Sequence, residues 1–290
     1  MSEDAICDKV NEASLVYADS LNQDLMTYVK RLVKSFGLAK DSYMVAPYTY
    51  FYYGGFDVDI KNEMIPHNYD GDEPLQLYQH ADDLDRTRIT MNYMNVLNNY
   101  ARGWNKKNIV LGLVGITMAQ EDNTDDNSAH YISYVYFKGR AGKKARLCMF
   151  DSGGWRRDEI YYYLMKDTFD VAKSDLELNT GVFEKDGGES KSEFTYVGQN
   201  IFCHTWSLWF WNQLLGNGLS MKEISALAGK RTMKNRDNLV RIKTYIYTVL
   251  IPTVKLKFDS ERDEKLFMRN FRYIFSNKEA IRKLVIPAPA

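Results

Sequence analysis

The chain has 290 residues, of which 45 % are apolar and 26 % are charged, and its 38 Lys and Arg are balanced by 38 Asp and Glu. A chain of this length can form one or two domains with a sizeable core, and the even charge balance excludes a general electrostatic attraction to nucleic acid or anionic membranes. The three cysteines, Cys7, Cys148 and Cys203, are too few and too scattered for a disulfide framework or a zinc site, so we expect a reducing, cytoplasmic compartment, no metal and no cofactor.

The first third of the chain is predicted to be mostly helical. Apolar residues recur at three- and four-residue steps over 13–36 and again over 82–100, a spacing typical of amphipathic helices. Between them, residues 43–72 are rich in Tyr, Pro, Gly and Asp, which favours irregular structure. We therefore expect residues 1–103 to form a helical N-terminal region.

From residue 104 onwards strands dominate and are followed by helices. In chain order the pattern predicts a buried strand at 108–118, an alternating strand at 130–137, a returning strand at 145–150, a helix at 155–171, a short strand at 194–197 and an apolar helix at 203–215. Two or three basic helices complete the chain between 221 and 284. Strands and helices do not alternate regularly, which argues against a parallel, doubly wound sheet. The prediction is an α+β fold with a mixed central sheet flanked by helices, and residues 104–290 form its catalytic domain.

Three reactive side chains fall at the ends of these predicted elements. His130 opens a strand, and Asp151 closes the returning strand of the same hairpin, so the two side chains are expected to lie close together. Cys203 opens the apolar helix, where the positive end of the helix dipole favours a thiolate. Gln199 lies four residues before it. Together they supply a nucleophile (Cys203), a base (His130), a group that orients the base (Asp151) and an oxyanion donor (Gln199, with the backbone N–H of Cys203).

These segments resemble a known family. His130-Tyr131, the run Met149 to Gly154, and Gln199 shortly before Cys203 are similar to the SUMO-specific and adenovirus-type (adenain-like) cysteine proteases, which use the chain order His, Asp or Asn, Gln, Cys. The aromatic residues and Ser after Cys203 resemble the versions carried by large DNA viruses. The likeness covers 108–215. It departs from the family where Tyr131 replaces a usual Trp, where His204 replaces a common Gly, and where Gln199 stands closer to the cysteine.

Plainer interpretations compete with these roles. A single Cys in an apolar helix is commonly a core residue, and only its company with the other three polar groups favours Cys203 as a nucleophile. We expect Cys148 to be buried and inert, and His204 to be a core or capping residue because it points about 100° around the helix from Cys203. The acidic loop at 121–126 lacks the pattern of a calcium loop. The segment 220–231 has a helix-turn-helix look, but such patterns are common in ordinary cores, and we do not expect nucleic acid as a partner.

The sequence favours a thiol peptidase, a hydrolase, over a structural protein. The resemblance implies cleavage of peptide or isopeptide bonds after small, Gly-type residues, with a protein or polyprotein as substrate. If the chain is viral, it further implies the processing of structural proteins, contact with capsid or other virion proteins, and packaging in the virion. The alternative is a catalytically inactive structural or assembly protein of a large virus that keeps the protease fold. No apolar run approaches the roughly 20 residues that span a bilayer, so we expect no membrane.

Overall fold

The computed structural model describes residues 16–54, 75–80, 97, 104–118, 130–140, 142–153, 168–183, 202–228 and 235–276. Its strands are β1 Tyr43–Val45, β2 Thr49–Gly54, β3 Leu75–His80, β4 Ile109–Met118, β5 His130–Phe137, β6 Arg146–Asp151 and β7 Leu176–Leu178. Its α-helices are α2 Leu25–Ser35, α5 Cys203–Trp211, α6 Met221–Ala228, α7 Asn235–Tyr245, α8 Ile251–Val254 and α9 Glu261–Ser276. Short 3-10 turns lie at Trp104–Lys106 and Lys173–Asp175, and π-helical turns at Asn212–Gly216 and Ile246–Leu250.

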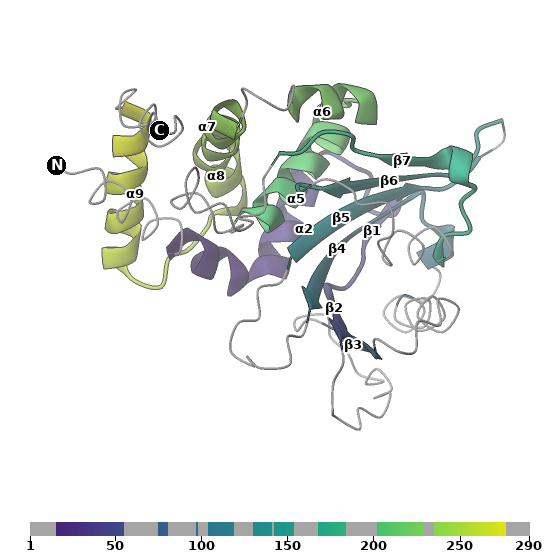
Figure 1. Cartoon of the computed structure of the whole chain (residues 1–290), viewed down its shortest axis with the longest axis horizontal. Helices are drawn as coiled ribbons and strands as arrows, with labels where there is room; N and C mark the ends of the chain where they lie inside the picture. The colour runs from purple at the N-terminus through teal and green to yellow at the C-terminus, as the bar shows by residue number, and fades with distance from the viewer. Residues whose placement is uncertain are drawn as a thin grey trace, which may run out of the picture.

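The strands form one mixed sheet in the order β3-β2-β4-β5-β6-β7, with β1 also pairing with β4. The central β4-β5-β6 segment is antiparallel, whereas β1, β2 and β3 on one side and β7 on the other add parallel pairs. Helices α2 and α5 lie beside this sheet, and α7, α8 and α9 lie beyond them (Figure 1). The predicted α+β class with a mixed central sheet is therefore confirmed.

The central strand β4 is buried on both faces over its residues 110–114. In β4, Leu111 and Leu113 join the core that contains α2 and α5, whereas Val110 and Val114 join a second core with Trp104 and other residues. Burial on both sides explains why this strand is a continuous apolar run instead of an alternating one.

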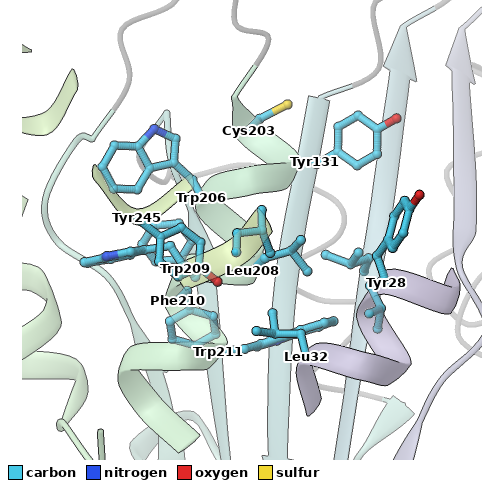
Figure 2. Packing of buried hydrophobic residues seen from close by; sticks show 14 of the residues in the cluster. Tyr28, Leu32, Tyr131, Cys203, Trp206, Leu208, Trp209, Phe210, Trp211 and Tyr245 are labelled. Atoms are coloured by element: carbon cyan, nitrogen blue, oxygen red, sulfur yellow. The ribbon is translucent and has the colours of Figure 1, made fainter. Parts of the chain in front are cut away.

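Helix α5 is buried along its whole length. All nine of its residues are buried, and Trp211 donates a hydrogen bond from its indole Nε1 to the backbone oxygen of Tyr134 in β5, at 3.3 Å. Figure 2 shows Leu208 on the side of α5 towards Leu32 of α2, and Trp206 and Trp209 on the side away from it. Because the core surrounds α5, its first residue, Cys203, is fixed relative to the strands.

One prediction for the N-terminal region is wrong in its described part. Residues 43–54 are not irregular but contain β1 and β2, which pair in parallel with β4 over three and five residues. Tyr-rich sequence suits a pleated surface, and the partner strand lies more than fifty residues away in the chain, so local composition did not indicate it. The sheet and the core thus continue across residue 103. The helix predicted at 13–36 is confirmed as helical residues 16–22 and α2, and the division into two domains stays a prediction.

From residue 104 onwards, the predictions that fall on described residues are mostly confirmed. β4, β5, β6 and α5 agree with the predicted elements to within a few residues. The short parallel strand β7 was not predicted. The predicted strand at 194–197, the loop at 121–128 and most of the helices at 82–100 and 155–171 lie outside the described residues. Among the described residues, no helix combines the length and the apolar character needed to span a membrane.

Candidate active site

The hairpin of β5 and β6 places His130 and Asp151 next to each other. In its register Ile132 is opposite Asp151, so His130, two residues earlier, shares the face of the sheet on which the carboxylate lies. The distance from His130 Nε2 to Asp151 Oδ1 is 2.7 Å. The two ends therefore meet as the sequence predicted.

Asp151 is held tightly. Its side chain is 2 % exposed, and the same oxygen that binds His130 also accepts a hydrogen bond of 2.8 Å from the backbone N–H of Gly153. This second bond folds the turn after β6 back onto the carboxylate. A buried carboxylate costs free energy unless it is paired, and the imidazole and the turn amide provide that pairing.

Cys203 completes the group. It is the first residue of α5, after Phe202, whose side chain makes no capping hydrogen bond to the helix. Figure 2 shows its sulfur at the start of the helix, with Tyr131 of β5 to one side and Trp206 to the other. Its thiol forms a hydrogen bond with the His130 side chain. Since Nε2 of that ring is bound to Asp151, Nδ1 is left for the thiol.

The electrostatics of His130 follow from these contacts. Burial of the ring lowers its pKa, but hydrogen bonds to Asp151 and Cys203, and the charges of both, outweigh burial and raise the pKa to about 11. An imidazole in this setting keeps its proton through neutral pH. The arrangement therefore favours an imidazolium between two anionic partners, a carboxylate and a thiolate.

The other candidates behave as core residues. His204 is 3 % exposed. Burial lowers the pKa of its imidazole to about 4, and its ring stacks on Tyr17 at 6.5 Å between ring centroids. Cys148 is fully buried in β6, and burial together with the charge of Glu177 raises the pKa of its thiol to about 12. Both side chains lack the partners that would make them reactive.

Some of the remaining candidates from the sequence lie outside the described residues, and the others have structural contacts. Gln199, Cys7 and the acidic loop at 121–126 lie outside the described residues. Within the described ranges, no group of three or more His, Cys, Asp and Glu side chains could hold a metal ion, and the absence of a metal or other cofactor stays a prediction. Arg241, a basic residue that follows the helix-turn-helix-like segment at 220–231, donates hydrogen bonds to the Leu227 backbone oxygen and to Asn238 within the fold.

Sequence reasoning missed Asn179. This residue follows β7, is 2 % exposed, and forms hydrogen bonds through its side-chain amide with the backbone of Asp151. The available signal was an Asn between a Leu-Glu-Leu strand and Thr-Gly, which indicates a turn. That Asn179 binds the Asp151 backbone becomes visible only from the pairing of β6 with β7.

Comparison with known proteins gives little to add. No family model and no curated protein matches the chain. Among solved structures, the chain is similar to the Legionella pneumophila effector protein RavZ, with a TM-score of 0.30 and 10 % sequence identity. The match covers 83 % of this chain and 64 % of that one, so the chain spans less than two thirds of the effector's length. At this TM-score the similarity carries no argument, and the resemblance to adenovirus-type proteases stays a prediction.

Proposed function

We propose that the chain is a thiol peptidase whose nucleophile is Cys203, whose base is His130 and whose orienting group is Asp151. One observation carries the proposal: a single imidazole makes hydrogen bonds both to a buried carboxylate and to a thiol at the start of a helix. A nucleophile, a base and a group that orients the base, connected in a line, are the arrangement that covalent acyl transfer requires.

The chemistry follows from the protonation states that these contacts favour. The Cys203 thiolate attacks the carbonyl carbon of the substrate, and the negative charge moves to the carbonyl oxygen. The His130 imidazolium then donates its Nδ1 proton to the departing nitrogen, the C–N bond breaks, and an acyl-enzyme remains. Water, deprotonated by the now neutral imidazole, attacks the acyl carbon. The C–S bond then breaks, which releases the acid and restores the Cys203 thiolate beside the His130 imidazolium.

The oxyanion needs donors, and two are proposed. The first is the backbone N–H of Cys203, which lies at the positive end of α5. The second is Gln199, which the sequence places four residues before Cys203. Asp151, held by the Gly153 amide, keeps the ring in the orientation that leaves Nδ1 towards the sulfur.

Substrate class rests on the family resemblance alone. By that resemblance the substrate is a protein or polyprotein that is cleaved after small, Gly-type residues. Processing of viral structural proteins, contact with capsid proteins and packaging in a virion extend the same resemblance and need their own tests. A cytoplasmic, reducing compartment is proposed because a reactive thiol must stay reduced.

A second function has an observation in its favour. Cys203 is only 1 % exposed, and a thiol must be reached by the substrate carbonyl before it can attack. Permanent burial would leave a protease-like fold that serves as a structural or assembly protein without turnover. The two functions differ in one measurable property, the accessibility of the thiol in the native state.

The experiment is native labelling with an electrophilic thiol probe, read at the peptide level by mass spectrometry. All proteins carry Cys7→Ala, so that the remaining thiols are Cys148 and Cys203, and Cys148→Ala is the matched control for Cys203→Ala. The peptidase predicts rapid native labelling that Cys203→Ala abolishes, that Cys148→Ala leaves unchanged and that prior iodoacetamide blocks. Labelling of Cys203 only after denaturation, at the rate of Cys148, would favour the structural protein.

A further inference from the structure

The segment 179–183, called the brace here, connects the two halves of the candidate site. It begins directly after β7 with Asn179 and ends with Phe183, and both side chains are buried, at 2 % and 3 % exposed. At one end it contacts the strand that carries Asp151, and at the other end it contacts the helix that begins with Cys203.

At the first end, the Asn179 side chain makes the hydrogen bonds to β6 that a longer β7 would otherwise make. The register of β6 and β7 pairs Met149 with Leu178, and Asn179 adds one more backbone bond, from its N–H to the Met149 oxygen at 3.4 Å. Beyond that point its side chain continues the pairing. Asn179 Oδ1 accepts a hydrogen bond from the Asp151 N–H at 2.9 Å, and Nδ2 donates to the Asp151 backbone oxygen at 2.7 Å.

The same amide also fixes the brace itself. Nδ2 donates a further bond to the Gly181 backbone oxygen at 2.9 Å, and the Phe183 N–H donates to the Ser152 oxygen at 2.8 Å. The backbone N–H and C=O of Asp151, which point away from β5, thus both have a hydrogen-bond partner in the Asn179 side chain. Since a buried peptide group without a partner costs free energy, the position of the Asp151 backbone depends on Asn179.

At the second end, Phe183 packs between strand and helix. Its ring centroid lies 5.2 Å from that of Phe150 in β6, 5.1 Å from Trp206 and 5.3 Å from Trp209 in α5. Trp206 is three residues after Cys203, within the first turn of the helix. The brace thus connects the end of β6, where Asp151 contacts His130, with the first turn of α5, which begins with Cys203.

We propose that Asn179 is a positioning residue of the active site, which fixes the Asp151 backbone so that its carboxylate holds the His130 ring against Cys203. The inference rests on the proposed function. Asn179 touches neither the substrate nor the reacting atoms, and it acts through Asp151. It makes three side-chain hydrogen bonds where a simple turn residue needs one, and two of them are to the residue that orients the base.

The test follows the rate of Cys203 alkylation by iodoacetamide from pH 5 to pH 9, by peptide mass spectrometry, in the Cys7→Ala background. It needs no substrate. An ion pair of thiolate and imidazolium keeps the rate high well below the ordinary thiol pKa of about 8.5. Asn179→Ala should lower the rate at pH 6 by about tenfold or more and move the pH profile towards that of an ordinary thiol, since a tenfold change corresponds to about one pKa unit.

Ser225→Ala is the matched control. The Ser225 hydroxyl accepts a hydrogen bond from the backbone of the brace at Thr180, at 3.1 Å, without contacting Asp151, so its loss should leave the profile unchanged. Asn179→Ser is the second variant, in case the alanine variant does not fold. Its short hydroxyl can replace only one bond, so a smaller shift in the same direction is expected.

The outcomes separate the two proposals. A wild-type profile typical of an ordinary thiol would overturn the proposed function. The positioning role alone would be overturned if the wild-type profile is that of a reactive thiolate and every folded Asn179 variant keeps that profile unchanged. This holds even where the melting temperature of the variant falls. A shift in the Asn179 variants but not in Ser225→Ala supports it.

Discussion

Replacing Asp151 by Asn and by Ala distinguishes the orienting role of this side chain from its charge. One oxygen, Oδ1, accepts both the His130 bond and the Gly153 N–H bond. The single carbonyl oxygen of Asn can therefore keep both bonds, and its amide nitrogen takes the place of Oδ2. Alanine removes the acceptor, leaves the ring free to rotate and leaves the Gly153 amide without this partner.

The magnitudes follow from the strength of the bonds. A hydrogen bond to a charged group contributes about 1.5–3 kcal/mol, and a neutral one about 1 kcal/mol. Asp151→Ala should then lower turnover by about 10- to 150-fold, at roughly tenfold for each 1.4 kcal/mol. Asp151→Asn keeps a neutral bond, so it should lose only about 0.5–2 kcal/mol and lower turnover by about 2- to 30-fold.

The assay is turnover of any cleavable peptide, or iodoacetamide alkylation of Cys203 at pH 6 where no substrate is known, with folding checked by circular dichroism. Asp151→Asn should retain more activity than Asp151→Ala in both assays. If Asn is as damaging as Ala in correctly folded protein, Asp151 acts through its charge or by shaping the turn at 152–154, and the orienting role is refuted.

Three further predictions concern the strands, the pH dependence and the oxyanion. Gly112→Ala should destabilise the protein by about 1–3 kcal/mol in urea unfolding, because a Cβ there would lie 2.6 Å from the Tyr134 hydroxyl oxygen and 2.7 Å from two carbons of its ring. An unchanged unfolding midpoint would contradict this close packing. The pKa of His130 is raised on folding, so its contribution to the free energy of unfolding is complete below about pH 6.5 and is lost as pH rises towards about 11. The difference in unfolding free energy between wild type and His130→Ala should therefore shrink over that range, by up to about 1.4 kcal/mol per pH unit. A difference that grew with pH would refute the ion pair. Gln199→Ala should lower turnover by about 10²–10³ with little change in substrate affinity, and normal turnover would remove Gln199 from the mechanism.

The meeting of His130 and Asp151 could be predicted from the sequence because a hairpin is local. Two alternating segments joined by a short Gly-containing turn place the start of one strand beside the end of the other. Likewise, the wholly apolar character of 203–211 indicates a buried helix. The site residues that the structure describes come from these local patterns.

Other features depend on contacts between distant parts of the chain. β1 and β2 form strands because they pair with β4, and no local pattern in their Tyr-rich sequence specifies that partner. Asn179 has its role only because β7 places it against Asp151. The near-complete burial of Cys203 depends on every element that packs around α5.

The most direct test of the central claim is the titration of the His130 imidazole by nuclear magnetic resonance, in wild type and in Cys203→Ala. If Cys203, His130 and Asp151 form one charged unit, the wild-type ring keeps its proton well above pH 7, and the loss of the thiol moves its titration to lower pH. A ring that titrates near the ordinary value of about 6.5, and that does so equally in both proteins, would contradict the account.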